Sequence, residues 1–421
     1  MQTNRRSFLK SGAALLATGT VTGCATAART DPAALRGNAD ALLRNAVASG
    51  DVAGVVAAAT TREGAFYETA FGERVLGQGP AMNLDTVCWI ASMTKPLVGA
   101  GVMQLVEQGR LDLDAPAGKL IPYLGEVQVL DGWDDKGEPR LRPARSPVTL
   151  RNLLTHTSGF VYDIWDPDIA RYTKVKNLPR AGSGRNIALQ IPLAFDPGAR
   201  WEYGIGIDWA GKMLEAASGM RLGAYLRQNL FAPLGMDSTG FRISPEMRAR
   251  LAKVHSRGAD GRLTVTGFEV PQEPEFESGG GGIYSTAGDY LRFARMILNG
   301  GAGNGNRVLR ADTVALMSKN NIGNLRVSML KTQNAVLSRD AEFFIGAPKT
   351  WGLTFMINEE QAPTGRSAGS LAWAGLANTY MWIDPRRGVA GVYLTQILPF
   401  VDEKSFPLYL AFEKAVYQSL G

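Results

Sequence analysis

The chain has 421 residues, 45% of them hydrophobic, enough for one large domain or two of ordinary size. Its formal net charge of +6 comes without a long basic run, so the composition does not favour a nucleic-acid-binding protein. A local basic patch, Arg140, Arg142 and Arg145, is expected in a solvated loop. The cysteines are Cys24 and Cys88, and because the first lies at the end of the expected signal, no internal disulfide is expected.

Residues 1–30 are expected to be an export signal. The run NRRSFLK at residues 4–10 resembles the bacterial twin-arginine signal, and the apolar stretch over 13–23 is too short to span a bilayer. The run VTGC at 21–24 resembles a lipoprotein cleavage box, which would attach a lipid to Cys24, whereas ATA at 25–27 offers an ordinary cleavage site. Both routes lead to the periplasm, with the protein either free or anchored to the membrane.

The hydrophobic pattern places strands at both ends of the chain and helices in the middle. This order predicts an α+β fold with an antiparallel sheet flanked by helices and built from both termini, and a mainly helical inserted domain. The expected domains are residues 31–85 with 285–421, and residues 86–284, with the active site at their interface. Helices are expected over 33–48, 208–218, 222–234, 289–298 and 407–420, and strands over 55–60, 65–71, 350–358, 371–382 and 388–395.

Ser92 and Lys95 stand at the start of a segment whose apolar residues recur at helical spacing up to Gly109. Three residues apart on a helix, their hydroxyl and amino groups share one face, an arrangement that gives a serine a neighbouring base without histidine. The same spacing begins at Ser7, inside the export signal, and at Ser328, among polar residues. A serine that caps a buried helix beside a solvated lysine accounts for the local pattern equally well.

His156 and His255 are the only histidines of the chain, and their positions decide whether a second serine motif could be catalytic. The run GRSAG at 365–369 matches the nucleophile elbow of α/β-hydrolases, whose catalytic histidine follows the serine in the chain. No histidine follows Ser367, so this run is expected to be a glycine-rich loop. His156 is interpreted as a structural residue that bonds loop backbone, and His255 as a surface residue. Two scattered histidines without a paired-cysteine motif favour no metal site, and no cofactor is expected.

Two further motifs are ambiguous when taken singly. Tyr203, in YGIG at 203–206, either packs in the core or projects from a glycine-bounded loop into a cleft. Trp373, in WAG at 373–375, is interpreted as a buried residue of a predicted strand. Taken together, four motifs in this order resemble those of the serine β-lactamase-like hydrolases: SMTK at 92–95, LLTHTSG at 153–159, YGI at 203–205 and WAG at 373–375. This superfamily includes class C β-lactamases, D-alanyl-D-alanine carboxypeptidases and family VIII carboxylesterases. PLGM at 233–236 and IYSTAGD at 283–289 are also similar, and the resemblance covers about residues 32–421.

The resemblance implies a β-lactamase/penicillin-binding-protein-like fold with Ser92 as the nucleophile. It also implies that Lys95 and Tyr203 share the general-base role. An ammonium about 4 Å from a phenol supplies roughly 4 kcal/mol at an effective dielectric of 20. That is about what lowering a phenol pKa by three units requires, so an alkaline activity optimum is expected. The third motif is expected to form an edge strand, ending in Gly375, and the backbone N–H groups of Leu376 and Ser92 are expected to form the oxyanion hole.

Two departures from the family pattern bear on the substrate. Lactamases and peptidases usually have Lys-Thr-Gly in the third motif, whereas this chain has Trp373 at the first position, as family VIII esterases do. The tyrosine motif often ends in asparagine, whereas here it ends in Ile205. Both departures remove polar contacts to a charged amide substrate and add apolar surface around the expected substrate site. An uncharged carboxylic ester with a short acyl chain therefore fits better.

The expected function is that of an exported serine carboxylesterase that works through an acyl-enzyme without metal or cofactor. Its expected partner is a small-molecule ester or amide, with no nucleic acid. A β-lactamase, a D-alanyl-D-alanine carboxypeptidase or a small-amide hydrolase remains an alternative on the same site. A non-catalytic binding protein on the same scaffold is the alternative of another class.

Overall fold

The computed structural model describes residues 32–420. The expected export signal and Cys24 lie outside the described residues. Within residues 32–420, no helix combines the length and the apolar character needed to cross a membrane.

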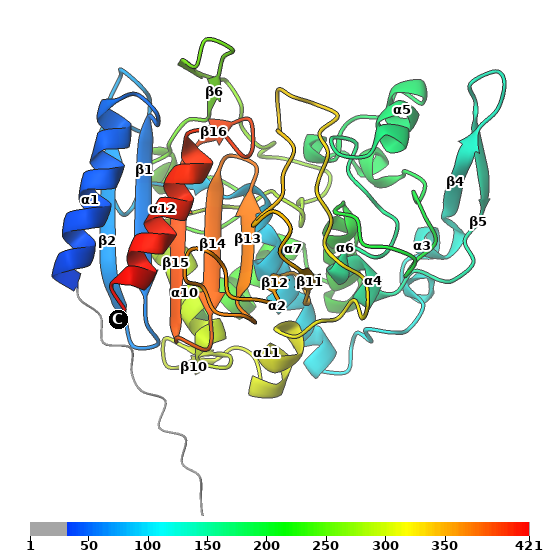
Figure 1. Ribbon diagram of the computed structural model, residues 1–421. Helices are drawn as coiled ribbons and strands as arrows, with labels where there is room; N and C mark the ends of the chain where they lie inside the picture. The colour runs from blue at the N-terminus through cyan, green and yellow to red at the C-terminus, as the bar shows by residue number, and fades with distance from the viewer. Residues whose placement is uncertain (1–31, 421) are drawn as a thin grey trace, which may run out of the picture.

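A seven-stranded antiparallel sheet joins the two ends of the chain (Figure 1). The sheet pairs β1 with β15, with Val56 opposite Leu394, and this is why residues about 340 positions apart in sequence share one sheet. Every residue of β1, β14 and β15 is buried, because helices cover both faces of the sheet. The strands, in spatial order, are β11 (Lys349–Trp351), β12 (Met356–Asn358), β13 (Leu371–Gly375), β14 (Thr379–Asp384), β15 (Val389–Leu394), β1 (Gly54–Thr60) and β2 (Ala65–Gly72).

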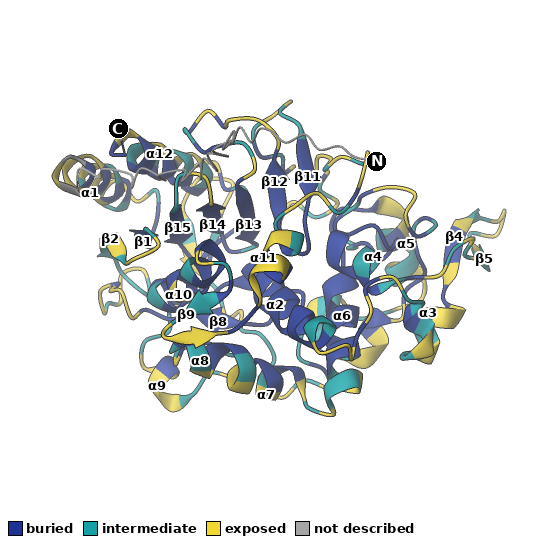
Figure 2. Ribbon diagram, turned by 90° about the horizontal axis from the view of Figure 1, so that it is seen from below, coloured by how far each residue is buried: buried dark blue, intermediate teal, exposed yellow. Residues whose placement is uncertain are grey.

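Two helices from opposite ends of the chain cover one face of the sheet, α1 (Pro32–Ala48) and α12 (Ser405–Gln418). The other face packs against α10 (Ala287–Leu298) and α2 (Thr94–Glu107), as Figure 2 shows from below. Helix α2 is buried along nearly its whole length, because it lies between the sheet and the helical part of the molecule. Its first turn therefore lies where the two parts of the fold meet.

The inserted helical part contains α3 to α9. Helix α6 packs against α2 and α4, and Gly219, in the left-handed conformation, ends it. The expected helix over 222–234 is continuous, but it contains a π-helical turn at Arg227–Phe231. The elements are α3 (Pro122–Glu126), α4 (Leu150–Thr155), α5 (Pro167–Val175), α6 (Gly206–Ser218), α7 (Leu222–Leu226), α8 (Ala232–Leu234) and α9 (Pro245–Arg248).

Shorter elements connect the two parts. The ribbon of β3 (Cys88–Trp89) and β8 (Tyr284–Ser285) fixes the chain just before α2 against the chain just before α10. Another small sheet joins β16 (Ile397–Leu398), β6 (His255–Arg257) and β7 (Leu263–Val265), while β4 (Gln128–Trp133) and β5 (Pro139–Pro143) form a projecting hairpin. The remaining elements are β9 (Ala302–Gly303), β10 (Asn306–Arg307) and α11 (Ala311–Met317).

The structure corrects two of the expected strands. The segment predicted as one strand over 350–358 is a hairpin of β11 and β12, which turns at Thr354 with a φ of +78°. The segment predicted over 371–382 is likewise a hairpin of β13 and β14, which turns at Asn378 with a φ of +56°. Both turns lie inside apolar runs and contain no Gly-Pro or Asn-Gly dipeptide. The hydrophobic pattern therefore continues through each turn and predicts one long strand where the chain forms two.

Candidate active site

Ser92 lies in a short 3-10 helix, Ala91–Met93, that runs directly into α2. Ala91 has a φ of +44°, which is unusual for a residue with a side chain and marks a locally strained backbone. The preceding residues are held from both sides: the Ile90 N–H donates to the Ile283 carbonyl at 3.0 Å, and the Trp89 N–H donates to the Gln396 side chain at 2.9 Å. This support presents the Ser92 side chain to a cavity while Met93 is buried.

Lys95 lies one turn further along the helix, and its side chain is completely buried. Its Nζ lies 3.1 Å from Ser92 Oγ, 3.2 Å from the Tyr162 hydroxyl and 2.6 Å from the Gly280 carbonyl oxygen. Burial lowers the pKa of Lys95 to about 7, although the negative charge of Asp208 opposes this shift. A substantial fraction of Lys95 is therefore a neutral amine at neutral pH, able to accept the Ser92 proton.

Tyr203 meets Ser92 from the other side, as the resemblance implied. Its hydroxyl is close enough to Ser92 for the serine to act against the rise of its pKa, and it accepts a bond from Trp373 Nε1 at 3.0 Å. Lys95 Nζ lies 4.6 Å from the centroid of the Tyr203 ring, so the ammonium faces the ring. Burial raises the pKa of the Tyr203 phenol, which corrects the expectation that Lys95 lowers it. Tyr203 is therefore expected to be a neutral phenol at neutral pH, which leaves Lys95 as the candidate base.

The sequence interpretation missed Tyr162, which completes the surroundings of Lys95. It follows the LLTHTSG motif by three residues, and its ring centroid lies 5.4 Å from that of Tyr203. Burial raises the pKa of Tyr162 well above its ordinary value, so it too is a neutral phenol. Its position in the loop after a recognised motif was the available signal, but a tyrosine without flanking glycines gave no reason to select it.

The residues expected to form the oxyanion hole lie at the end of β13 and at the Ser92 turn, which it approaches. A Cβ on Gly375 would lie 2.3 Å from the Ile90 carbonyl oxygen, so glycine at this position allows the strand to approach the Ser92 turn. The backbone N–H groups of Ser92 and Leu376 make no hydrogen bond with other groups of residues 32–420. Both are thus available to an oxygen that develops negative charge. Strand β13 is third in the sheet rather than an edge strand, yet β12 pairs only with its residues Leu371 and Ala372.

Three of the residues expected to bind substrate do not line the cavity. Trp373 lies behind Tyr203 and holds its hydroxyl, Gly375 serves the close approach of the backbone, and Ile205 is buried at the start of α6. Leu376, in contrast, lines the cavity beside Ser92.

The two histidines are both buried. The Nδ1 atom of His156 accepts a bond from the Gly204 N–H at 3.2 Å, so this residue holds the loop that carries Tyr203, as its structural interpretation predicted. The expectation that His255 is a surface residue is wrong, because it lies in β6 between two strands and its Nε2 accepts a bond from the Leu76 N–H at 3.2 Å. The GRSAG run is a loop, and the Ser367 N–H donates to Asp384.

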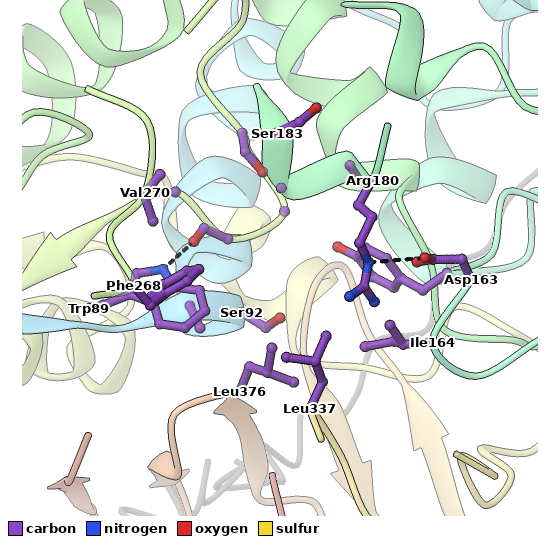
Figure 3. A pocket seen from close by; sticks show the side chains of 18 of the residues that line it. Trp89, Ser92, Asp163, Ile164, Arg180, Ser183, Phe268, Val270, Leu337 and Leu376 are labelled. Atoms are coloured by element: carbon purple, nitrogen blue, oxygen red, sulfur yellow. Dashed lines mark hydrogen bonds and ion pairs between the residues drawn. The ribbon is translucent and has the colours of Figure 1, made fainter. Parts of the chain in front are cut away.

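A cavity of about 510 Å³ opens above Ser92 (Figure 3). Most of its wall is apolar, and Trp89 and Phe268 contribute two rings, tilted by 42° to each other, whose centroids lie 4.5 Å apart. On the opposite side, Arg180 and Asp163 form an ion pair at 3.1 Å. Such a lining suits an uncharged acyl group or alcohol of moderate size. The other large apolar side chains of the wall are Ile164, Trp165, Val270, Leu337 and Leu376. Within residues 32–420, no cluster of three or more potential metal-ligating side chains occurs.

The lowered pKa of Lys95 leads to a specific pH dependence. Below pH 7 the amine is protonated and has no lone pair for the Ser92 proton, so activity should rise with pH through a limb near 7 and level off above about pH 8. The value of kcat/KM, measured with an ester in a constant-ionic-strength buffer from pH 5 to 10, tests this expectation. A profile that is flat across this range would contradict a titrating base.

The bond from Trp373 to Tyr203 gives a second expectation. Trp373→Phe removes the indole donor that holds the Tyr203 hydroxyl, so kcat should fall about tenfold, the effect of roughly one lost hydrogen bond. Because Trp373 does not line the cavity, KM should change little. Steady-state kinetics separate the two constants, and a change confined to KM would instead place the indole in contact with substrate.

Comparison with known proteins agrees with this geometry. The family model described as "Beta-lactamase" matches residues 39–414. Monacolin J acid methylbutanoyltransferase of Aspergillus terreus is 34% identical over 412 residues, covering 93% of this chain and 97% of the relative. Lovastatin esterase of Penicillium rubens is 31% identical over 395 residues, which cover 90% of this chain and 98% of the relative. A mutant of simvastatin synthase from Aspergillus terreus superposes with a TM-score of 0.79 at 32% identity, covering 91% and 94% of the two chains. The expected fold and superfamily are thus confirmed.

Proposed function

Because this chain belongs to the β-lactamase family, in which its relatives include acyltransferases and an esterase, we propose that it is a serine hydrolase that cleaves carboxylic esters with short acyl groups. The observation that carries the proposal is the 3.1 Å contact between the buried amine of Lys95 and the Oγ of Ser92, a residue that lines an apolar cavity. A buried amine with a pKa of about 7 is a base suited to a serine at neutral pH.

The reaction follows from the positions of these groups. Ser92 Oγ attacks the ester carbonyl carbon while its proton passes to Lys95 Nζ, and the N–H groups of Ser92 and Leu376 hold the oxyanion. When the tetrahedral intermediate collapses, the C–O bond to the alcohol breaks and Lys95 returns the proton to the leaving oxygen. A water molecule then attacks the carbonyl carbon of the acyl-enzyme while Lys95 Nζ takes a proton from it. The bond between that carbon and Ser92 Oγ breaks, and Lys95 returns the proton to Oγ, which releases the acid and restores Ser92. Tyr203 keeps the serine oxygen in line throughout.

Two features favour an ester over a charged amide. Trp373, which takes the place of the usual lysine of lactamases and peptidases, is buried behind Tyr203 and offers no cation to a substrate carboxylate. The apolar wall favours an aliphatic acyl group, and the name of one relative, a methylbutanoyltransferase, specifies a short branched one. A short acyl chain is therefore the first choice for a test substrate.

Acyl transfer to an alcohol is the second candidate function. The observation that favours it is the relationship to monacolin J acid methylbutanoyltransferase over nearly the full length of both chains. In such a reaction an alcohol takes the place of water at the acyl-enzyme, and the first half of the mechanism is unchanged. An apolar cavity that binds an alcohol and excludes water would favour transfer over hydrolysis.

The test compares p-nitrophenyl butyrate with a chromogenic cephalosporin, each with and without an added alcohol as acyl acceptor. Ester turnover well above cephalosporin turnover, with a butyryl group found by mass spectrometry on the Ser92 peptide, is the expected result. A new ester product formed at the expense of butyrate would favour the transferase. Faster cephalosporin turnover would favour a β-lactamase, and the absence of both turnover and labelling by a fluorophosphonate probe would favour a binding protein.

We also propose that the protein is exported through its N-terminal segment. The support is the NRRSFLK run and the two candidate cleavage sites that follow it. The mass of the mature N-terminus distinguishes the routes: a diacylglycerol adduct at Cys24 indicates a lipid anchor, and an unmodified N-terminus near residue 28 indicates a free periplasmic protein. An intact residue 1 in the native host would contradict export with cleavage.

A further inference from the structure

Asp208 is a completely buried carboxylate in the first turn of α6 that the proposed mechanism has not used. Its Oδ1 accepts hydrogen bonds from the Ser278 hydroxyl at 2.8 Å and from the Gly280 N–H at 2.9 Å. Its Oδ2 has no hydrogen-bond partner within residues 32–420. A buried carboxylate oxygen without a partner is costly, so its retention calls for a reason beyond the anchoring of a loop.

Gly280 connects this carboxylate to Lys95. The N–H of Gly280 is bound by Asp208, and the carbonyl of the same residue accepts the 2.6 Å bond from Lys95 Nζ. A Cβ on Gly280 would lie 2.5 Å from Asp208 Oδ2 and 2.7 Å from the Tyr162 hydroxyl. The unpaired carboxylate oxygen and the phenol that bonds Lys95 therefore flank the same point of the glycine backbone.

The other titratable groups around Lys95 carry no charge that replaces that of Asp208. Tyr162 and Tyr203 are buried phenols with raised pKa values, and His156 is a buried imidazole whose pKa lies well below its ordinary value. Asp163, beyond Tyr162, is paired with Arg180 at the cavity wall. Within residues 32–420, Asp208 forms no ion pair with Lys95 or another cation, and its charge raises the pKa of Lys95 across the Gly280 backbone. Burial raises the pKa of Asp208 itself, while the bonds from Gly280 and Ser278 and the charge of Lys95 oppose that shift.

We infer that Asp208 is a positioning residue for Lys95: it fixes the Gly280 carbonyl against the amine, and its negative charge stabilises the ammonium that forms when Ser92 loses its proton. The inference rests on the proposed function, because it assumes that Lys95 is the base. The physical reason is that proton transfer creates an ammonium on a side chain that is completely buried from solvent. A fixed carboxylate behind the glycine backbone compensates part of that cost, and without it Lys95 would be a weaker base.

The test replaces the charge and keeps the shape. Asp208→Asn retains an oxygen for the Ser278 and Gly280 bonds, and the limb of kcat/KM assigned to Lys95 should move to lower pH by on the order of one unit, with the plateau reduced at least about tenfold because the base is weaker. Asp208→Glu restores the charge and should return the limb to near its original pH. Glu215→Gln, a carboxylate-to-amide change on the same helix, should leave the limb in place.

A merely structural role would lower the melting temperature or the yield without moving the limb, so an unmoved limb in folded Asp208→Asn overturns the inference. If that variant does not fold, Gly280→Ala provides the test, since its methyl group would displace Asp208 Oδ2 and the Tyr162 hydroxyl. The limb should then shift, and a wild-type profile would overturn the inference.

The same profiles are measured as the rate at which a fluorophosphonate labels Ser92, which needs no ester substrate. Labelling without ester turnover would contradict the proposed function while it still tests Asp208. If neither reaction occurs, Lys95 activates nothing and the inference fails together with the mechanism.

Discussion

Replacement of Ser92 by alanine is expected to reduce ester turnover by on the order of 10⁴-fold or more. The side chain that would carry the acyl group is then missing, and no other serine lies within hydrogen-bond distance of Lys95 Nζ in the part of the chain that the structure describes. A 10⁴-fold loss corresponds to about 5.5 kcal/mol of transition-state stabilisation. The kcat/KM for p-nitrophenyl butyrate and the stoichiometry of fluorophosphonate labelling both measure this loss.

The fold should survive this change, because Ser92 presents its side chain to the cavity and Lys95 keeps its bonds to Tyr162 and Gly280. The chain offers a matched control in Ser328→Ala, which alters the same Ser-x-x-Lys spacing in an exposed loop and should leave turnover unchanged. Full labelling of the Ser92→Ala protein would place the nucleophile elsewhere and reject the proposed site.

The parts of the fold that the sequence predicted correctly carry their own local signals. The hairpin of β1 and β2 has apolar strands on both sides of an Arg-Glu-Gly turn, and α2 has a continuous helical period after its serine. The hairpins of β11–β12 and β13–β14 were missed because their turns pass through Thr354 and Asn378, without the dipeptides that usually mark a turn. Tertiary contacts stabilise those turns, and such contacts are not visible in a local pattern.

The residues of the candidate site also divide into those that carry a local sequence signal and those that do not. Ser92, Lys95 and Tyr203 come from motifs with fixed internal spacing, and the structure brings all three together. Asp208 and Tyr162 form hydrogen bonds with residues that are distant in sequence, Gly280 and Lys95, and a single sequence does not reveal such pairs. The pKa of Tyr203 was expected to fall because the charge of Lys95 was considered without the burial of the phenol. Burial has the larger effect in the folded chain.

Because the proposed mechanism assigns the proton transfer to Lys95, the second large effect is expected there. Lys95→Met keeps an unbranched side chain of similar length in the buried site and removes the amine, so turnover should fall at least about a thousandfold, or about 4 kcal/mol. The limb near pH 7 should disappear as well, because the group that titrates there is gone. The remaining rate should rise steadily with pH, since hydroxide then removes the serine proton. Rate measurements from pH 5 to 10 distinguish this loss of the limb from a general loss of activity.

The structure also explains why the fold should tolerate the change. Methionine needs no desolvation of an ammonium, while the Gly280 carbonyl and the Tyr162 hydroxyl each lose one donor, so the two effects on stability oppose each other. Lys331→Met, at the end of the exposed Ser-x-x-Lys spacing, is the control and should keep both the rate and the limb. Near-normal turnover in folded Lys95→Met would exclude Lys95 as the base and leave Tyr203 and Tyr162, the two phenols around it, to be tested next by substitution with phenylalanine.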